Sequence, residues 1–207
     1  MTDKKIGILN FGAGNIFSIC NALENFTTNV VKSNDLDILK STDTLILPGV
    51  GSFRNCITTM KKIGLDNFIH EYIATGKHIL GICLGMHILL KEGNEDGYEK
   101  GLNVIDGSVN KIKIKNKDRL PHIGWNDVYG DNMTELKIFK GIKQKSDFYF
   151  VHSYQVNLNE NLNALYTNYG GQNIIAAFEK DNVNAVQFHP EKSQIVGSRL
   201  LQNFTNL

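Results

Sequence analysis

The stretch HILGICLGMHILL, residues 78–90, decides which fold this chain can adopt. Its first five residues form an apolar run typical of a buried strand, and the residues after Cys83 have the spacing of a helix. Gly81 and Gly85 stand on either side of the cysteine. Glycines at both positions favour a sharp strand-to-helix turn, because larger side chains would collide there, and such a turn exposes the side chain at its apex.

The pattern around this turn predicts strands that alternate with helices. Strands are expected at 5–10, 29–32, 44–47 and 78–82, with helices after the first strand through Asn25, at 65–75 and at 84–91. Such alternation predicts an α/β fold, with a mostly parallel central sheet and helices on both faces. After about Gly101, short alternating runs at 109–115, 147–156, 163–170, 174–179 and 184–190 predict an antiparallel section joined to that sheet, and 197–206 a last helix. No repeat or linker is apparent, so we expect one domain over residues 1–207.

Composition places the chain among ordinary globular proteins. Hydrophobic residues make up 42% of it and the net charge is +1, so we expect neither nucleic acid nor a membrane as a partner. We interpret the lysine-rich stretch at 111–117 as an exposed strand. No apolar segment is long enough to span a bilayer, and the short apolar stretch near the N-terminus argues against a signal peptide. Three cysteines without CxxC spacing argue against a disulfide framework or a metal site and favour a cytoplasmic protein.

Cys83 has two interpretations from this pattern alone. As a nucleophile it would stand at the carboxyl end of a strand, where a helix N-terminus favours its thiolate and the Leu84 N–H is free to help bind an oxyanion. As a structural residue it would fill the core beside a glycine-rich turn. The turn itself does not choose between them.

A nucleophilic cysteine needs a base, and that base needs a group to orient it. His189 stands out among six histidines, because it ends the strand-like run VQFH and Glu191 follows two residues later. In an extended segment these two side chains would point to the same side, so the carboxylate would hold the imidazole in one tautomer. Taken alone, the pair is better explained by a strand-end histidine beside an incidental surface acid.

The stretch Pro48-Gly49-Val50-Gly51 ends another predicted strand. Its glycines would let the backbone approach a substrate, and its N–H groups would point at a developing oxyanion. Taken alone, the stretch is also explained by a plain turn.

Together these residues resemble the signature of the class I glutamine amidotransferases, in which a Gly-x-Cys-x-Gly turn precedes a His-Pro-Glu tail. The finer similarity is to the glutaminase subunits of imidazole glycerol phosphate synthase, from histidine biosynthesis. It rests on six motifs that span nearly the whole chain in order: NFGAGN (10–15), LPGVGSF (47–53), GICLGM (81–86), PHIGWN (121–126), YFVHSY (149–154) and QFHPEKS (187–193).

The resemblance implies a Cys83–His189–Glu191 triad that needs no metal or other cofactor. Cys83 would attack the side-chain amide of glutamine, His189 would pass a proton to the leaving ammonia, and Glu191 would support the imidazolium. Hydrolysis of the γ-glutamyl thioester would then release glutamate. The resemblance also implies the following oxyanion and substrate contacts: Gly49, Val50, Gly51, Leu84, His87, Glu95, His152, Ser153 and Tyr154.

The same resemblance implies a partner subunit. Ammonia released into neutral water is protonated and is then no nucleophile, which favours its delivery inside a complex. In the family the partner is a (β/α)₈-barrel synthase, the cyclase, which forms imidazole glycerol phosphate and AICAR within a heterodimer. Asn15 and Trp125 match positions that lie toward that partner, and a core position explains Trp125 equally well.

One position departs from the family pattern. Where the family usually has a glutamine that contacts substrate, this chain has His87, at i+4 from Cys83 on the predicted helix. A histidine there can donate or accept a hydrogen bond, carry charge that favours the thiolate, or merely fill space.

Two alternatives to the histidine pathway therefore stay open. One is a glutaminase that serves a different synthase, such as one that amidinates a bacterial surface sugar. The other is a stand-alone cysteine hydrolase.

Overall fold

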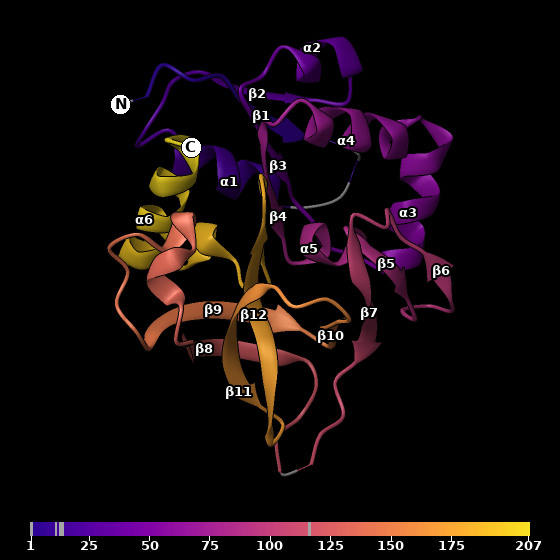
Figure 1. Cartoon of the computed structure of the whole chain (residues 1–207), viewed down its shortest axis with the longest axis vertical. Coiled ribbons are helices and arrows are strands. Elements are labelled where there is room, and N and C mark those ends of the chain that lie inside the picture. The colour runs from indigo at the N-terminus through magenta and orange to yellow at the C-terminus, as the bar shows by residue number, and fades with distance from the viewer. Residues whose placement is uncertain (1, 11, 13–14, 116) are drawn as a thin grey trace.

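A seven-stranded sheet forms the centre of the molecule, in the order β11-β12-β13-β4-β3-β1-β2 (Figure 1). The computed structural model describes residues 2–10, 12, 15–115 and 117–207. Five strands run parallel, namely β1 (Ile6–Leu9), β2 (Val30–Ser33), β3 (Thr44–Leu47), β4 (His78–Ile82) and β13 (Val183–Val186). The strands β12 (Gln172–Lys180) and β11 (Asn163–Tyr169) extend this sheet antiparallel. The predicted mostly parallel sheet, joined to an antiparallel section, is confirmed.

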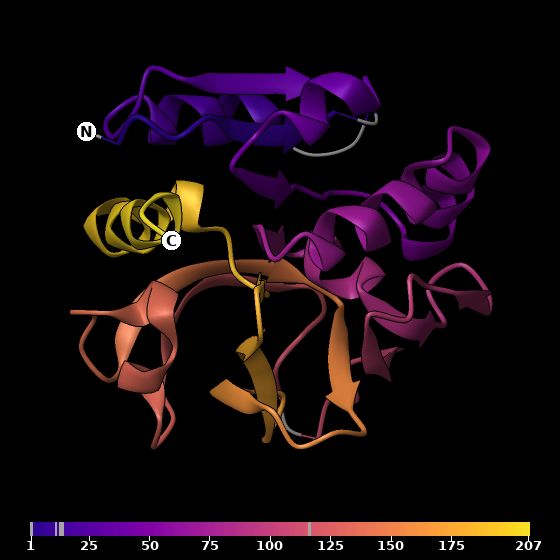
Figure 2. The ribbon, with the colours of Figure 1, turned by 45° about the horizontal axis from the view of Figure 1, so that its top comes forward.

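Helices cover both faces of this sheet, as expected (Figure 2). One face packs against α1 (Ile16–Leu23) and α6 (Gln194–Thr205), and the other against α3 (Phe53–Lys62) and α4 (Leu65–Ala74), beside which lies α2 (Leu36–Lys40). Alternate residues of one strand serve the two faces: Leu45 and Leu47 pack with α3 and α4, whereas Ile46 packs with α1 and α6. Burial on both faces explains why β3 reads as a continuous apolar run.

Two smaller sheets flank the carboxyl edge of the parallel strands. One has the order β10-β7-β5-β6, and in the other β8 pairs antiparallel with β9. Their bounds are β5 (Leu90–Gly93), β6 (Glu99–Lys100), β7 (Ile105–Lys111), β8 (His122–Val128), β9 (Ser146–His152) and β10 (Tyr154–Leu158). The short 3₁₀ segments are η1 (Met133–Glu135), η2 (Lys137–Phe139) and η3 (Pro190–Lys192).

The helix expected at 84–91 is much shorter in the structure. The helix α5 spans only Leu84–Ile88, and β5 begins at Leu90. From Leu90 the chain is extended and pairs with β7, and the carbonyl groups of residues 88–90 accept hydrogen bonds from N–H groups of residues 102–105 instead of from a following helical turn. Long-range pairing therefore overrides the local helical spacing.

Other differences from the expectations are local. The helices α2 and α3 are not among the predicted elements. The run at 184–190 contributes β13, which pairs parallel with β4 and antiparallel with β12, and so joins the two kinds of sheet. The expected lysine-rich strand at 111–117 is wrong, because β7 ends at Lys111, although its four lysines are exposed. No helix among the described residues is both long and apolar enough to cross a lipid bilayer.

Candidate active site

Three neighbouring parallel strands end at the same edge of the central sheet and carry the candidate residues there. The strand β3 is followed by Pro48-Gly49-Val50-Gly51, β4 by Cys83, and β13 by Gln187-Phe188-His189. The strand β4 lies between the other two. Because the carboxyl ends of parallel strands share one edge, the topology brings these distant segments together where open α/β sheets bind their ligands.

Cys83 stands at the apex of the turn between β4 and α5. Its φ of 53° and ψ of −108° lie outside the regions that side chains favour, so the backbone is strained there. A Cβ on Gly85 would lie 1.9 Å from the carbonyl oxygen of Leu47, and one on Gly81 would lie 2.6 Å from the carbonyl oxygen of Gly85. Only glycine fits at either position, which is the steric requirement expected from the sequence.

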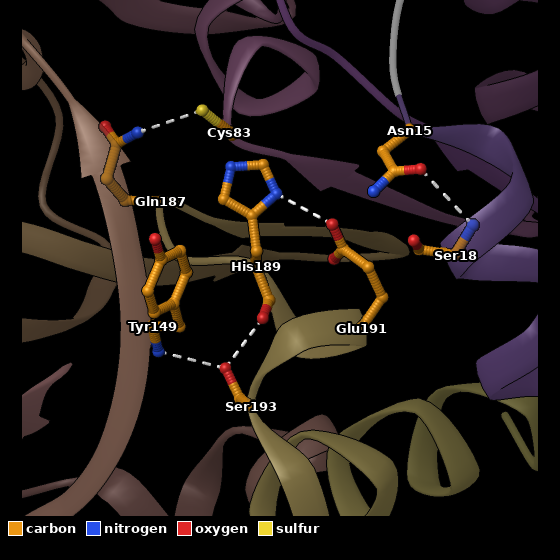
Figure 3. A network of polar contacts seen from close by, with 8 residues as sticks. All are labelled: Asn15, Ser18, Cys83, Tyr149, Gln187, His189, Glu191 and Ser193. Carbon is orange, nitrogen blue, oxygen red and sulfur yellow. Dashed lines mark hydrogen bonds and ion pairs between the residues drawn. The ribbon is translucent and has the colours of Figure 1, made fainter. Parts of the chain in front are cut away.

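The His189 ring lies between Cys83 and Glu191 (Figure 3). Its Nδ1 is 2.8 Å from Glu191 Oε1, and the glutamate side chain is only 1% exposed. Glu191 is therefore a buried partner of the imidazole and no incidental surface acid. The segment that joins them is the 3₁₀ turn η3, not the extended chain that we expected, and the turn folds the carboxylate back onto its histidine.

Charge on His189 is favoured by both neighbours. Burial alone would lower its pKa, but Cys83 and Glu191 raise the pKa to about 10. Nε2 has no aligned hydrogen-bond partner among the described residues and is turned toward Cys83, so its interaction with the sulfur is electrostatic here (Figure 3). A protonated imidazole at this place favours the thiolate, the nucleophilic form of cysteine.

A cavity of about 280 Å³ opens above Cys83. It lies near the lower end of the range for ligand pockets, which suits a single amino acid. Its lining residues are Val50, Gly51, Cys83, Leu84, His87, Glu95, Pro121, Val151, His152, Ser153, Tyr154 and His189. Pro121 and Val151 are additions to the expected set. Among the described residues, no three His, Cys, Asp or Glu side chains gather as metal ligands would.

Val50 and Gly51 border this cavity, whereas Gly49 packs beneath it. A Cβ on Gly49 would lie 2.4 Å from Leu84 Cβ, so this glycine lets the loop rest against the cysteine turn. Within the described residues, the N–H groups of Val50 and Gly51 make no hydrogen bond. The Leu84 N–H opens α5, where a helix has no acceptor of its own. These three N–H groups can bind an oxyanion at the cavity.

Glu95 is half-buried at the cavity and is no exposed loop acid. Its Oε2 accepts a hydrogen bond of 2.9 Å from the Phe53 N–H, at the start of α3. Burial raises the pKa of Glu95. One carboxylate oxygen is thus held by the backbone, and the group supplies negative charge near Cys83.

The segment from His152 to Tyr154 is held by a chain of hydrogen bonds. His152 Nδ1 is 2.8 Å from the Tyr154 carbonyl oxygen, which fixes the proton on Nδ1 and makes Nε2 an acceptor. Nε2 lies 3.0 Å from Nδ1 of His122, a buried ring stacked between Phe150 and Tyr169. Burial lowers the pKa of His122 to about 4 and that of His152 to about 3, so both rings are neutral.

His87 lies on the floor of the cavity beside Gln187. Its Nε2 is 2.7 Å from Gln187 Oε1, and Gln187 Nε2 is 3.7 Å from Cys83 Sγ. Burial lowers the pKa of His87 to about 4, so the ring is uncharged near neutral pH. The structure therefore argues against a cationic His87 that favours the thiolate by its charge.

The family model described as glutamine amidotransferase class-I matches residues 7–206. This match covers every part of the site described above. The chain belongs to the class I glutamine amidotransferases.

Curated relatives of this amidotransferase match nearly its whole length. The imidazole glycerol phosphate synthase subunit HisH of Pelagibacter ubique is 39% identical over 98% of this chain and 99% of its own. The subunit of the same name from Methanocaldococcus jannaschii is 41% identical over 98% of this chain and 99% of its own.

Solved structures support the fold. A crystal structure of a glutamine amidotransferase, 19% identical, superposes with a TM-score of 0.74 over 97% of each chain. A putative GMP synthase component from Thermoplasma acidophilum, 20% identical, has a TM-score of 0.71 over 100% of this chain and 94% of its own.

The two expected interface residues of the amidotransferase differ in role. Asn15 caps α1, since its Oδ1 accepts from the Ser18 N–H at 3.4 Å. Trp125 is 49% exposed on β8 and touches Tyr149 edge-on, so it is no core residue. Phe11, Ala13 and Gly14 of the 10–15 motif, and Asn116 of the lysine-rich stretch, lie outside the described residues.

Sequence reasoning missed two side chains of the amidotransferase site, Gln187 and Ser193. The Ser193 hydroxyl donates to the His189 carbonyl oxygen at 2.6 Å and accepts from the Tyr149 N–H at 3.0 Å, which anchors the histidine backbone (Figure 3). Both residues lie within QFHPEKS. The available signal for Gln187 was its position two residues before His189, because side chains at i and i+2 of an extended run point to the same side.

Proposed function

We propose that this chain hydrolyses glutamine to glutamate and ammonia, with Cys83 as nucleophile, and delivers the ammonia to a synthase of histidine biosynthesis. One observation carries the chemistry: Cys83, on a strained turn, faces an imidazole Nε2 that has no hydrogen-bond partner among the described residues. The Nδ1 of the same ring is held by the buried carboxylate of Glu191. The match over residues 7–206 supports the proposal that the whole chain forms one glutaminase domain.

The raised pKa of His189 favours a thiolate–imidazolium pair as the starting state. The thiolate attacks the carboxamide carbon of glutamine, and the N–H groups of Val50, Gly51 and Leu84 bind the oxyanion. His189 gives its proton to the departing nitrogen, so ammonia leaves and a γ-glutamyl thioester remains. Neutral His189 then takes a proton from water, which attacks the thioester, and collapse releases glutamate and the Cys83 thiolate.

Glu95 suits the other end of the substrate. Its carboxylate is held by the Phe53 N–H and provides negative charge for an α-ammonium group. The Ser153 and Tyr154 groups on the far wall would contact the α-carboxylate, and His152 fixes the backbone of that wall through the Tyr154 carbonyl group.

The relatives named as subunits of imidazole glycerol phosphate synthase support the histidine pathway over the other two functions considered. We propose a heterodimer with a (β/α)₈-barrel cyclase subunit in the cytoplasm, with imidazole glycerol phosphate and AICAR as products. The exposed apolar residues Ile123 and Trp125 lie on one face of β8, and Trp125 shares a groove with Ile195, which supplies a docking surface for such a subunit.

The test is a coupled assay of the chain with the barrel subunit of the same organism. Cys83→Ala should abolish glutamine-dependent product formation, while product still forms from added ammonium salts, because the nucleophile serves only ammonia release. Loss of the ammonia-dependent reaction in an assembled complex would contradict this division of labour.

The same assay tests the coupling between subunits. We expect the isolated chain to hydrolyse glutamine slowly and the complex with acceptor to hydrolyse it faster by ~10²–10³, the typical effect of one oxyanion donor. The reason is that the glycine-flanked Val50 peptide can rotate its N–H toward the cavity. Equal rates for chain and complex would rule this out. Peptide hydrolysis by the isolated chain would favour the stand-alone hydrolase.

A further inference from the structure

We propose that the Gln187 side chain donates a hydrogen bond to the Cys83 thiolate, and that His87 holds the Gln187 amide in the orientation that makes this contact. Cys83 then has two polar neighbours, His189 and Gln187. The proposal rests on Cys83 being the nucleophile of the proposed function and assigns Gln187 as a further catalytic residue and His87 as a positioning residue.

The contact geometry is a relay of three buried side chains. His87 Nε2 lies 2.7 Å from Gln187 Oε1, and Gln187 Nε2 lies 3.7 Å from Cys83 Sγ. The exposed fractions are 4% for His87, 0% for Gln187 and 8% for Cys83, so the Gln187 amide between the other two is shielded from bulk water. Figure 3 shows the Gln187 amide nitrogen aimed at the sulfur.

Hydrogen-bond chemistry allows one arrangement of this relay. A thiolate can only accept hydrogen bonds, so the Gln187 NH₂ group must face Cys83 and its carbonyl oxygen must face away. That oxygen meets Nε2 of His87, which must therefore carry the ring proton. Burial lowers the pKa of His87 to about 4, and a neutral ring with its proton on Nε2 meets this demand. The reversed amide would turn an oxygen lone pair toward the thiolate.

The local sequence explains why two donors converge on one sulfur. Gln187 and His189 lie at i and i+2 at the end of β13 and share a side, while Phe188 between them is fully buried in the core. His189 gives up its proton during the reaction, but a primary amide does not. Gln187 is thus a donor that stays in place when the imidazolium has become neutral.

Several other ionisable groups face Cys83, and the test must leave them unchanged. Besides His87 of the relay itself, they are His189 and Glu191 after β13, and Glu95, His152 and Tyr154 across the cavity. A comparison of variants that alter only the relay keeps the remaining charges constant.

The experiment measures the rate at which iodoacetamide alkylates Cys83 in the full chain as a function of pH, followed by mass spectrometry of the Cys83 peptide. Burial raises the pKa of Cys56 to about 12 and also raises that of Cys20, so both cysteines should be alkylated slowly. Mass spectrometry distinguishes their peptides from the Cys83 peptide. Gln187→Met keeps the shape and removes the donor. We expect its alkylation profile to shift to higher pH, and its Cys83 rate on the acidic limb of that profile to fall roughly tenfold, because a hydrogen bond to a charged group is lost.

Variants of His87 test the positioning role. His87→Leu should lower the rate in the same direction but less, since the Gln187 amide can then turn away. His87→Gln should recover most of the rate, because its amide can donate to Gln187 Oε1. The double variant His87→Leu/Gln187→Met should react like Gln187→Met alone, as expected for two residues that act through one contact.

Asn184→Leu is the matched control. It removes another fully buried amide from β13, whose contact is the Ile79 carbonyl group, and should leave the Cys83 rate unchanged. Thermal unfolding checks that each variant is folded, and if Gln187→Met is not, the two His87 variants decide. Alkylation equal to that of the parent from mildly acidic to mildly alkaline pH in the folded relay variants would falsify the relay.

Glutaminase activity, measured on the same proteins with the partner subunit, separates this inference from the proposed function. A relay effect on alkylation with no glutaminase activity in the parent would leave the relay intact and remove the function. Parent glutaminase activity that persists unchanged in Gln187→Met would leave the proposed function intact and remove the catalytic role of Gln187.

Discussion

Cys83 combines a reactive atom with a backbone that other residues avoid. Its φ of 53° is rare for a side chain with a Cβ, and such strain costs of order 1–3 kcal/mol. At this turn the sulfur lies beside His189 and borders the cavity. At the scale of single residues, reactivity here depends on an unfavourable backbone conformation that the surrounding packing enforces.

Three buried histidines lead to a prediction of how the stability of the fold depends on pH. His87, His122 and His152 have pKa values lowered by burial to about 4, about 4 and about 3. As the pH falls from about 6.5 toward about 4, the unfolded chain therefore takes up protons that the folded chain does not. The free energy of unfolding should decrease over this window, measured by urea unfolding at a series of pH values.

His122→Phe isolates one of these groups. It keeps an aromatic ring between Phe150 and Tyr169 but cannot titrate, so the acid-induced loss of stability should become shallower, whatever its stability at neutral pH. His70→Gln, at an exposed position of α4, is the control and should keep the parent slope. A parent whose stability stays flat over this window would show that these rings are not buried in neutral form.

At the scale of elements, the β4–α5 turn is limited by the approach of its backbone to β3. Gly85→Ala would place a Cβ 1.9 Å from the Leu47 carbonyl oxygen, and backbone cannot yield as a side-chain tip would. We expect a loss of stability of about 1–3 kcal/mol, the usual range for overpacking, together with loss of glutaminase activity. Urea unfolding and the coupled assay measure the two effects.

Gly64→Ala is the control for this prediction. Gly64 has a φ of 71° and open space around its Cβ position, so this variant has a conformational cost without a clash. It should keep glutaminase activity, since it opens α4, away from the cavity. If Gly85→Ala retained parent activity and stability, close packing of the turn would not be what its glycines provide.

At the scale of the whole molecule, we expect the exposed face of β8 to bind the barrel subunit. Trp125→Ala should weaken binding to the barrel subunit about tenfold or more, because exposed tryptophans are frequent hot spots of interfaces. Its thermal stability should stay close to that of the parent, since the side chain is half exposed. Titration calorimetry with the barrel subunit measures the affinity.

Tyr98→Ala provides the matched comparison for that surface. Tyr98 is an exposed aromatic that directly precedes β6, and the strands β6 and β8 lie far apart in Figure 1, so the variant should not affect binding. Equal affinities of Trp125→Ala and the parent for the barrel subunit would show that Trp125 is not part of the interface.

The sequence by itself determined the local requirements of this protein. The glycines at 81 and 85 specify a turn that no other residue fits, the apolar runs specify buried strands, and the alternation of strands with helices specifies a largely parallel sheet. The triad candidates followed as well, because Cys83 and the His189–Glu191 pair each have a recognisable local pattern. These features are readable because their physical causes act between residues close together in the chain.

Only the tertiary structure decided which of these local options are realised. The end of α5 at Ile88 follows from N–H groups of residues 102–105, and the contact of Gln187 with Cys83 follows from the pairing of β13 with β4. The neutral state of His87 follows from burial by segments distant in the chain. Burial, long-range hydrogen bonds and the order of strands depend on how remote segments meet, and no local pattern encodes that meeting.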